Sequence, residues 1–456
     1  MIMNFELKNN LKLTGMTPGT QRDIKKMLTL KNKQSEKLER MGKWCGNIPK
    51  HIIFYKEVGG TLICPRGAAE PIYHFCRARA EDVNVIDDRL ELDAVDFDFT
   101  GKLRPFQEQG IQTMLTRSDG IMVFPTGGGK TVAMLSLIAR RGQPCLVIVD
   151  KIELVYQWRD RAVQFLGLDP KEISIIGGGT FTIGDRLTIG TIQTISKRVD
   201  EIKDHFGFIV VDECHKAGAQ SFREAIGKFP ARYIASCTAT PFRDDGLTKA
   251  IEFYLGQVRY SIKKDELLDH GYLCEAKYQQ IPTDFFTTWD ASAEYVKVMG
   301  QLVADASRNE LICQTVADTA INGLSLILSG RVAHCEALRD MLEGCGIEAV
   351  VLTGKTPKKE REQLFDSITK GDITHIISTT NLLKEGFDLP ILQNLYLAFP
   401  VKWKGLVIQM IGRVLRPAPG KLTAMIYDFI DPGVGVLGNS ARIRAEVYEG
   451  EGIKAA

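Results

Sequence analysis

From residue 101 onward, runs of five or six apolar residues alternate with longer segments in which apolar residues recur every three or four positions. The short runs have the length of strands, and the longer segments have the spacing of amphipathic helices. Because strands that are apolar on both faces must be covered on both sides, this alternation predicts parallel sheets flanked by helices. The expected strands are GIMVF, CLVIV, RLTIGT, FIVVD, YIASCTA, LSLILS, EAVVLT, HIISTT, NLYLAF and AMIYDF.

Ten strands are more than one doubly wound domain usually contains, so the pattern predicts two such domains in tandem. Residues 256–300 interrupt the alternation and are expected to join the two domains. We therefore expect an α/β protein with a first domain over residues 101–270, a second over residues 271–440 and a short C-terminal tail over residues 441–456.

The first hundred residues differ from the rest in charge. Residues 1–79 contain 15 Lys and Arg against 6 Asp and Glu, whereas residues 80–100 contain 8 acids and one arginine. This change of sign predicts a small basic α+β module followed by an acidic connector. Within the module, IPKHIIFYKEVGGTLICPRG has the pattern of two strands around a Gly59-Gly60 turn, and QRDIKKMLTLKNKQSEKLERMG is expected to be largely helical.

Composition narrows the class of protein. Of the 456 residues, 44% are hydrophobic and 25% are charged, as in ordinary globular domains. No apolar run approaches the ~20 residues of a membrane helix, and the N-terminus lacks the layout of a signal peptide. The ten cysteines include no C-x-x-C pair, so reduced core cysteines are expected, without zinc sites or disulfides. We expect a cytoplasmic protein with no membrane partner.

One loop has the composition of a phosphate-binding site. The segment MVFPTGGGKTVAM places three glycines, Lys130 and Thr131 between a predicted strand and a predicted helix. Backbone N–H groups at a helix N-terminus attract anions, and glycines let phosphate oxygens approach the backbone closely. Lys130 would add a positive charge and Thr131 a hydroxyl for Mg²⁺. Phe124 stands where the G-x-x-x-x-G-K-[ST] pattern has glycine, so a glycine-rich turn without a ligand remains the alternative.

A pair of acids ends another predicted strand. In FIVVDECHKA, Asp212 and Glu213 follow a continuous apolar run. An acid at the carboxyl end of a parallel strand can hold Mg²⁺, and a second acid beside it can activate water. Repulsion and desolvation oppose adjacent carboxylates, so the pair indicates a function, with an exposed loop pair as the alternative.

Three polar residues of the second domain, Gln409, Arg413 and Arg416, are spaced to lie on one face of a helix. Burial of two neighbouring arginines is costly without an anionic partner. They are therefore candidates for phosphate contact, with a solvated basic stripe as the alternative.

Together these segments resemble, in the expected order over residues 101–430, the motifs of a superfamily 2 helicase of the DExH type. LRPFQEQG resembles the Q motif, PTGGGKT motif I, LVIVDKIELVYQW motif Ia and IGTIQTI motif Ic. VDECH resembles motif II, TATPFRDDG motif III, LILSGR motif IV, TTNLLKEGFDLP motif V and QMIGRVLR motif VI. The family commonly lacks the leading glycine of motif I. LRPFQ, DECH and GRVLR are most similar to the XPB, RecG and UvsW-like DNA translocases, and a compact chain of this kind resembles a phage branch-migration helicase.

The resemblance implies two RecA-like domains, ATP and Mg²⁺ as cofactors, and a role for each motif residue. Gln107 would recognise adenine, Asp388 would reach the ribose, and Arg413 and Arg416 would act as arginine fingers. The implied catalytic residues are Lys130, Asp212, Glu213, Gln409, Arg413 and Arg416, and the implied Mg²⁺ ligands are Thr131 and Asp212. The implied nucleotide contacts are Arg104, Gln107, Pro125, Thr126, Gly127, Gly128, Gly129, Lys130, Thr131 and Asp388, and the coupling residues are His215, Thr238 and Thr240.

DNA is the expected partner, in forked, branched or duplex form. Hydroxyl, amide and basic groups suit contacts to phosphate oxygens, which carry no sequence information. For Thr191 and Thr379 the alternative is an ordinary β-branched strand residue, and for the basic module it is neutralisation by the acidic connector. The candidate contacts are Thr191, Gln193, Thr379 and Thr380 in the two large domains and Lys43, Trp44, Lys50 and Arg66 in the module.

We therefore expect an ATP hydrolase coupled to DNA unwinding: a helicase that translocates on DNA and unwinds or branch-migrates forked substrates in replication, recombination or repair. Three alternatives share the same motifs, namely a double-stranded DNA translocase that never separates strands, a DNA-stimulated ATPase sensor and, less favoured, an RNA helicase. No stable protein partner is implied, and a monomer or weak oligomer is expected. Because every nucleotide motif lies beyond residue 100, removal of residues 1–79 is expected to leave basal ATPase activity intact.

Overall fold

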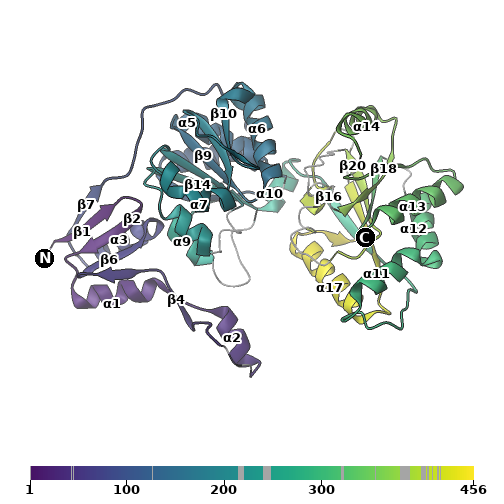
Figure 1. The fold of residues 1–456 in the computed structure, drawn as a ribbon, viewed down its shortest axis with the longest axis horizontal. Coiled ribbons are helices and arrows are strands. Elements are labelled where there is room, and N and C mark those ends of the chain that lie inside the picture. The colour runs from purple at the N-terminus through teal and green to yellow at the C-terminus, as the bar shows by residue number, and fades with distance from the viewer. Residues whose placement is uncertain are drawn as a thin grey trace. The chain divides into compact units, whose positions relative to one another are not determined.

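The computed structural model describes residues 2–42, 44, 46–125, 127–213, 220–239, 248–319, 323–354, 356–380, 391–401, 407, 410–412, 414–418, 421 and 423–456. They form two compact units (Figure 1), of which the first comprises Met1–Pro125 and Gly129–Ile262 and the second Thr126–Gly128 and Lys263–Ala456. Among the helices of this described part, none is long and apolar enough to cross a membrane.

The first unit begins with a small α+β domain. Its elements are β1 (Met3–Leu7), β2 (Asn10–Thr14), α1 (Pro18–Met27), β3 (Thr29–Lys31), α2 (Lys33–Arg40), β4 (His51–Ile53), β5 (Lys56–Val58), β6 (Thr61–Pro65), η1 (Arg66–Ala68), α3 (Ala69–Ala78) and β7 (Val83–Asp87). Five of the strands form one sheet in the order β5-β6-β2-β1-β7, in which β1 is antiparallel to β2 and parallel to β7. Phe5, Leu11 and Ile72 are fully buried in its core.

The hairpin predicted around Gly59-Gly60 is confirmed. β5 and β6 pair antiparallel with Val58 opposite Thr61, and both glycines have the positive φ that a two-residue I′ turn requires. The helical stretch predicted before it is only partly confirmed, because β3 separates α1 from α2 and pairs with β4. The β3–β4 ribbon and α2 extend away from the five-stranded sheet (Figure 1), and we call residues 29–53 the arm.

The basic module is joined to the domain that follows it through a buried arginine. Arg66 is 4% exposed, and its guanidinium donates to the backbone carbonyls of Ala231 and Arg232. Ala250, from the following domain, belongs to the same core as Phe5 of β1. The prediction that Arg66 contacts DNA is therefore wrong, because this side chain joins two parts of the protein in its interior.

The predicted boundaries of the module and the connector also need correction. β7 lies inside the predicted connector, yet it pairs with β1 from Met3 to Leu7, so the N-terminal sheet ends only at Asp87. Asp87, the last residue of β7, and Glu91 form ion pairs with Arg232 of the following domain. These two acids therefore neutralise a charge of the following domain, so this part of the connector's charge is not directed at the basic module alone.

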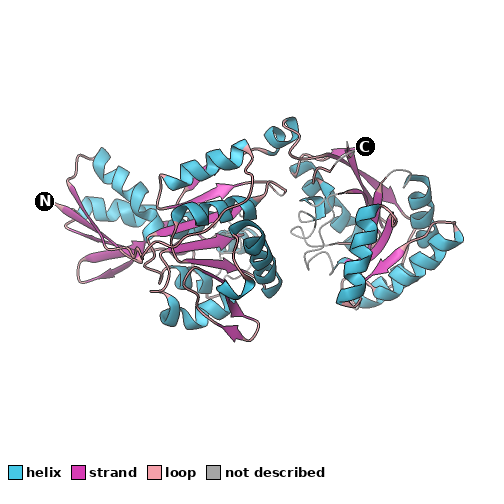
Figure 2. Ribbon diagram, turned by 90° about the horizontal axis from the view of Figure 1, so that it is seen from above, coloured by secondary structure: helices cyan, strands magenta, loops and turns pink. Residues whose placement is uncertain are grey.

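The rest of the first unit is a RecA-like domain around an eight-stranded sheet (Figure 2). The strand order is β11-β10-β12-β9-β13-β14-β8-β15, and every pair is parallel except β10 with β11. Its elements are α4 (Pro105–Leu115), β8 (Asp119–Val123), α5 (Lys130–Arg141), β9 (Cys145–Val149), α6 (Ile152–Leu166), η2 (Pro170–Glu172), β10 (Ile173–Gly177), β11 (Thr180–Phe181), β12 (Leu187–Thr191), α7 (Ile192–Ile202), β13 (Phe208–Asp212), α8 (Gln220–Ile226), β14 (Tyr233–Thr238), α9 (Thr248–Leu255) and β15 (Val258–Ser261).

The second unit is another RecA-like domain, around a parallel seven-stranded sheet in the order β18-β19-β17-β20-β21-β16-β22. Its elements are α10 (Lys264–Asp269), β16 (Glu275–Pro282), α11 (Tyr295–Ala304), α12 (Ala306–Thr319), β17 (Leu324–Ser329), α13 (Val332–Gly344), β18 (Val350–Leu352), α14 (Lys358–Lys370), β19 (His375–Thr379), β20 (Leu392–Leu397), β21 (Thr423–Ile430), α17 (Gly435–Gly450) and β22 (Lys454–Ala455).

The predicted class, two doubly wound domains in tandem, is confirmed, and all ten expected strands are present. The joining stretch is less simple than predicted, because it supplies β15 to the first sheet and β16 to the second, with the division between the units at Ile262. The predicted tail over residues 441–456 belongs to the second domain, since it contains most of α17 and the edge strand β22.

Two arginine–aspartate pairs are buried in the second domain, and the sequence patterns did not indicate them. Arg308 Nε lies 2.7 Å from Asp431 Oδ1, and Arg444 Nη2 lies 2.8 Å from Asp428 Oδ1. Arg308 also donates to the carbonyl of Ala398 at 2.7 Å. Because buried charges are costly unless fully paired, these contacts fix the end of β21 against the segment that follows β20.

We predict that Arg66→Met lowers the free energy of unfolding by about 1–3 kcal/mol, because two buried carbonyls lose their donors. Exposed Arg77, on α3, provides the control Arg77→Met. Urea denaturation of the full chain measures both, and equal midpoints for the two variants would mean that Arg66 does not join the domains. The same packing means that removal of residues 1–79 would expose apolar surface around Ala250. We therefore expect the truncated protein to be destabilised, and its basal ATPase activity to be lower than the sequence alone led us to expect.

Candidate functional site

The loop between β8 and α5 has a backbone that glycine permits. Gly127 and Gly129 have φ values of 85° and 77°, in the left-handed region. Gly129 is the N-cap of α5, so the first N–H groups of this helix, which have no intrahelical acceptor, lie at the loop. A loop of this shape can surround a phosphate group with N–H donors. Thr126 lies outside the described residues.

Two charged side chains meet beside this loop. Lys130 Nζ lies 3.6 Å from Glu213 Oε1, and both side chains are largely buried. Burial opposes the charge of Lys130, but nearby acids, Glu213 foremost, raise its pKa overall. Glu213 has a φ of 51°, which costs a non-glycine residue on the order of 1–3 kcal/mol. A strained carboxylate held against a lysine is a feature typical of functional sites.

Asp212 ends β13 directly before Glu213. Its Oδ2 accepts a hydrogen bond of 2.8 Å from Trp158 Nε1 on α6. Burial and the charge of Glu213 raise the pKa of Asp212 to about 6. The sequence analysis assigned no role to Trp158. Its spacing from Val155 places it on the buried face of α6, but no sequence signal gives the partner of its indole N–H.

The coupling residue Thr238 lies at the end of β14, next to β13. Its hydroxyl donates to Glu213 Oε2 at 3.4 Å, so the ends of these two strands meet at one carboxylate. His215 and Thr240, the other predicted coupling residues, lie outside the described residues.

Gln107 contacts the protein backbone at both ends of its amide. Oε1 accepts from the N–H of Arg104 at 2.8 Å, and Nε2 donates to the carbonyl of Gly129 at 3.3 Å. The amide thereby links the start of α4 to the glycine loop, and the residue is only 3% exposed. A contact with adenine would require the amide to give up these two hydrogen bonds. The recognition of adenine by Gln107 therefore stays a prediction.

The residues that meet at this edge of the sheet fit a nucleotide and a hard cation. The glycine loop and Lys130 match phosphate groups, and the Thr131 hydroxyl and Asp212 carboxylate are oxygen ligands of the kind that Mg²⁺ prefers. Within the described ranges, no cluster of three or more His, Cys, Asp or Glu could hold a metal. This donor set suits a cation that takes its remaining ligands from phosphate oxygens and water.

Comparison with known proteins gives matches to both large domains. A family model described as the res subunit of type III restriction enzymes matches residues 100–243, and one described as the helicase conserved C-terminal domain matches residues 307–418. The chain belongs to the superfamily 2 helicases.

Individual relatives place the chain among the XPB and UvsW-like members of this family. It is 25% identical over 359 residues to the DNA 3'-5' translocase XPB2 of Sulfurisphaera tokodaii, which covers 69% of this chain and 79% of the relative. It is 24% identical over 437 residues to the ATP-dependent DNA helicase UvsW of Enterobacteria phage T4, which covers 89% of this chain and 85% of the relative. The DNA-bound restriction-modification enzyme LlaBIII shares the fold, with a TM-score of 0.58 and 16% identity over 76% of this chain and 30% of that one.

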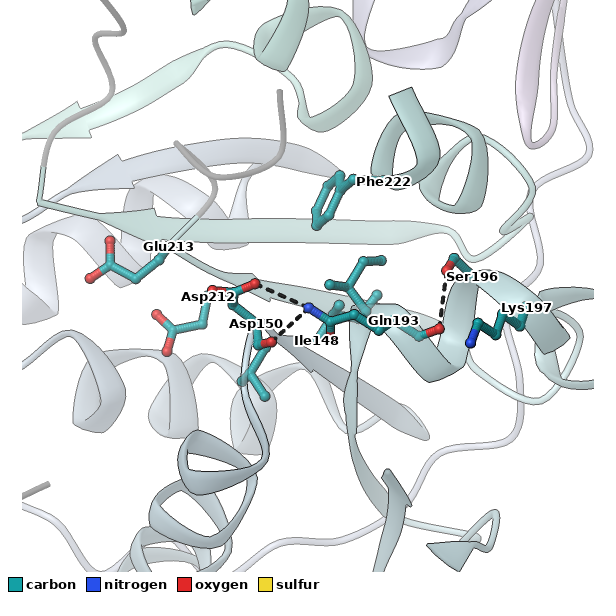
Figure 3. Close-up of a pocket in the computed structure, with 10 residues that line it drawn as sticks. Ile148, Asp150, Gln193, Ser196, Lys197, Asp212, Glu213 and Phe222 are labelled. Atoms are coloured by element: carbon teal, nitrogen blue, oxygen red, sulfur yellow. Dashed lines mark hydrogen bonds between the residues drawn. The ribbon is translucent and has the colours of Figure 1, made fainter. Parts of the chain in front are cut away.

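A pocket of about 400 Å³ extends from helicase motif II to the start of α7 in the first domain (Figure 3). Asp212 and Glu213 lie at one end, and Gln193, Ser196 and Lys197 of α7 lie at the other. Gln193 Nε2 donates to the carbonyl of Asp150 at 2.9 Å, so this side chain lines the pocket in a fixed orientation.

The predicted DNA contacts at the strand ends differ in exposure. Thr191 is 6% exposed, and its hydroxyl lies 3.1 Å from that of Thr194, which favours the alternative of a structural strand residue. Thr379 is likewise buried at the end of β19, whereas the next residue, Thr380, is partly exposed.

The remaining predicted site residues lie in motifs V and VI and in the arm. Residues 410–412 and 414 are helical, and we call them the motif VI helix. Arg416 follows this helix and is described, whereas Asp388, Gln409 and Arg413 lie outside the described residues. In the arm, Trp44 is 89% exposed, and Lys50 forms an exposed ion pair with Glu39. Lys43 lies outside the described residues.

We predict that Gly129→Ala abolishes nucleotide binding, because a Cβ there would overlap the Gln107 amide as well as strain the backbone. The matched control is Gly371→Ala at the C-cap of α14, where φ is 85° and a Cβ meets no atom within 4 Å. Both substitutions carry similar backbone strain, so fluorescent-nucleotide titration should distinguish them. Retained binding in Gly129→Ala would exclude this loop as the phosphate site.

Proposed function

We propose that this chain is an ATP-dependent DNA helicase that translocates on DNA and unwinds or branch-migrates forked substrates. The observation that carries the proposal is the meeting of the glycine loop, Lys130, Asp212 and Glu213 at one edge of the first RecA-like sheet. The relatives with a DNA translocase or DNA helicase name support the choice of DNA over RNA.

Hydrolysis would depend on an exchange of partners at Lys130. In this structure its ammonium pairs with Glu213. Phosphate oxygens offer Lys130 a stronger anionic partner, and their binding releases the Glu213 carboxylate to accept a proton from the attacking water. Thr131 and Asp212 would hold Mg²⁺, which neutralises phosphate charge. The Thr238 bond to Glu213 provides a path from the reacting end of the site to β14.

The second domain would complete the site when ATP is bound. Gln409, Arg413 and Arg416 would contact the phosphates, and Asp388 the ribose. Arginine fingers of this kind contribute roughly 10³–10⁵ in rate. Because only ATP offers both domains a shared γ-phosphate, binding and hydrolysis would close and release the two domains in turn.

The arm is the part of the N-terminal domain that best suits DNA. Residues 29–53 carry six Lys and Arg against two Glu, and their exposed Trp44 offers a surface for stacking. Residues 32–50 of the arm extend away from the sheet (Figure 1), whereas Leu30 and Ile52 at its base pack against the core. Lys43, Trp44 and Lys50 stay candidates on this basis.

We predict that Glu213→Gln lowers kcat for ATP hydrolysis by about 10²–10⁴ while nucleotide and DNA binding persist. The amide keeps the size of the carboxylate but cannot accept the proton. The control is Glu172→Gln, which changes an exposed carboxylate in η2 of the same domain and should retain full turnover. Turnover close to that of the wild type in Glu213→Gln would remove this residue from the role of base.

We predict that removal of the arm weakens DNA binding and its salt dependence. Lys31 and His51 are paired in the β3–β4 ribbon, so residues 32–50 can be replaced by an Asn-Gly turn that keeps the ribbon closed. Because each neutralised phosphate contributes about −0.9 to the slope of log affinity against log salt, the slope should shrink by several units. Basal ATPase activity serves as the control for folding. An unchanged slope on forked DNA would show that the arm does not bind phosphates.

A further inference from the structure

The segment that follows the motif VI helix contains two prolines, which limits how the end of the helix can be hydrogen-bonded. Residues 416–421 read RPAPGK, and neither Pro417 nor Pro419 has a backbone N–H. Pro417 and Pro419 stand three positions after Val414 and Arg416, so the i→i+3 bonds that commonly close the last turn of a helix cannot form to these two carbonyls. Buried carbonyls left without donors would cost about 1–3 kcal/mol each.

A buried lysine supplies the missing donors. Lys421 Nζ donates to the carbonyl of Val414 at 2.6 Å and to that of Arg416 at 2.8 Å. The carbonyl between them, of Leu415, accepts from the N–H of Cys274 at 2.8 Å. Three consecutive carbonyls are thus bonded, two of them by one side chain. A turn from Ala418, whose carbonyl accepts from the Lys421 N–H at 3.0 Å, brings the lysine back to the helix end.

Burial of the Lys421 ammonium is energetically unfavourable. Lys421 is only 8% exposed. Burial lowers the pKa of Lys421 to about 8, with the charge of Arg416 also lowering it and Cys274 opposing the shift. Below this pKa the side chain is still protonated, so a positive charge stays buried beside the positively charged Arg416. A methionine of similar length would fill the site without that cost, which indicates that the donors themselves are needed at this position.

We propose that Lys421 is a positioning residue for the motif VI arginine Arg416: its ammonium holds the backbone from Val414 to Arg416 and thereby sets where that guanidinium can reach. The proposal rests on the proposed function, in which Arg416 contacts phosphate during hydrolysis. A cation at the C-terminal end of a helix also interacts favourably with the helix dipole. Small misplacements of a catalytic group can cost on the order of 10² in rate, so a lysine that touches no substrate can control turnover.

A double-mutant cycle tests the proposal on the full-length protein. Lys421→Met, Arg416→Ala and their combination are compared by kcat and KM for DNA-stimulated ATP hydrolysis, with thermal midpoints alongside. We expect Lys421→Met to lower kcat about tenfold or more with a smaller change in KM, and to change kcat less than twofold when Arg416 is already alanine. The control Lys370→Met removes an exposed lysine from the last turn of α14 and should leave kcat within twofold.

The outcomes separate this proposal from the proposed function. An unchanged kcat in Lys421→Met, or an equal loss of kcat in the presence and absence of Arg416, would overturn the positioning role. If Arg416→Ala alone turned over at the wild-type rate, the arginine-finger part of the proposed function would fail. If Lys421→Met melts below the assay temperature, the same double-mutant cycle is measured with Lys421→Gln, which keeps a single neutral donor group.

Discussion

The parallel arrangement of β8, β13 and β14 is the constraint on which the rest of the site depends. Because parallel strands end at the same edge of a sheet, the glycine loop after β8, the acids at the end of β13 and Thr238 at the end of β14 are brought together. The ion pair between Lys130 and Glu213 neutralises part of the charge that this convergence concentrates. The two adjacent carboxylates have different partners, since Asp212 accepts from Trp158 and Glu213 pairs with Lys130. The positive φ of Glu213 accompanies this difference. A site built in this way binds anions and cations together, as a nucleotide with its metal requires.

The N-terminal domain is joined to the first RecA-like domain by buried contacts. Arg66, buried against the start of β14, ties the five-stranded sheet to the same RecA-like sheet that carries motif II. The core shared through Ala250 makes the N-terminal domain and the first RecA-like domain one compact unit, to which the arm belongs.

The sequence predicted the regular parts of this structure well and the long-range side-chain contacts poorly. All ten expected strands were found because continuous apolar runs need burial on both faces wherever they occur. The strands β10, β11, β15, β16 and β22, which lie at or next to an edge of their sheets, were not among the expected strands. β11, β15 and β22 have four residues or fewer, and β16 is partly polar, so their pairing partners define them more than their own pattern does. Charge composition misassigned Arg66, since a count of charges does not distinguish a solvated arginine from one whose donors are used inside the protein. The roles of Trp158 and Lys421 depend on partners 54 and 5–7 residues away, which no local spacing rule indicates.

In the proposed function, ATP hydrolysis at the β8–β13–β14 edge drives movement on DNA. Rates of ATP hydrolysis measured with duplex DNA, forked DNA and RNA of matched length, together with displacement of a third strand from a DNA triplex and of one strand from a fork, test it most directly. The account predicts stimulation by DNA over RNA, and displacement of both the third strand and the fork strand that ceases in Lys130→Ala. Triplex displacement without fork unwinding would identify a duplex translocase, and DNA-stimulated hydrolysis with neither displacement would contradict the account.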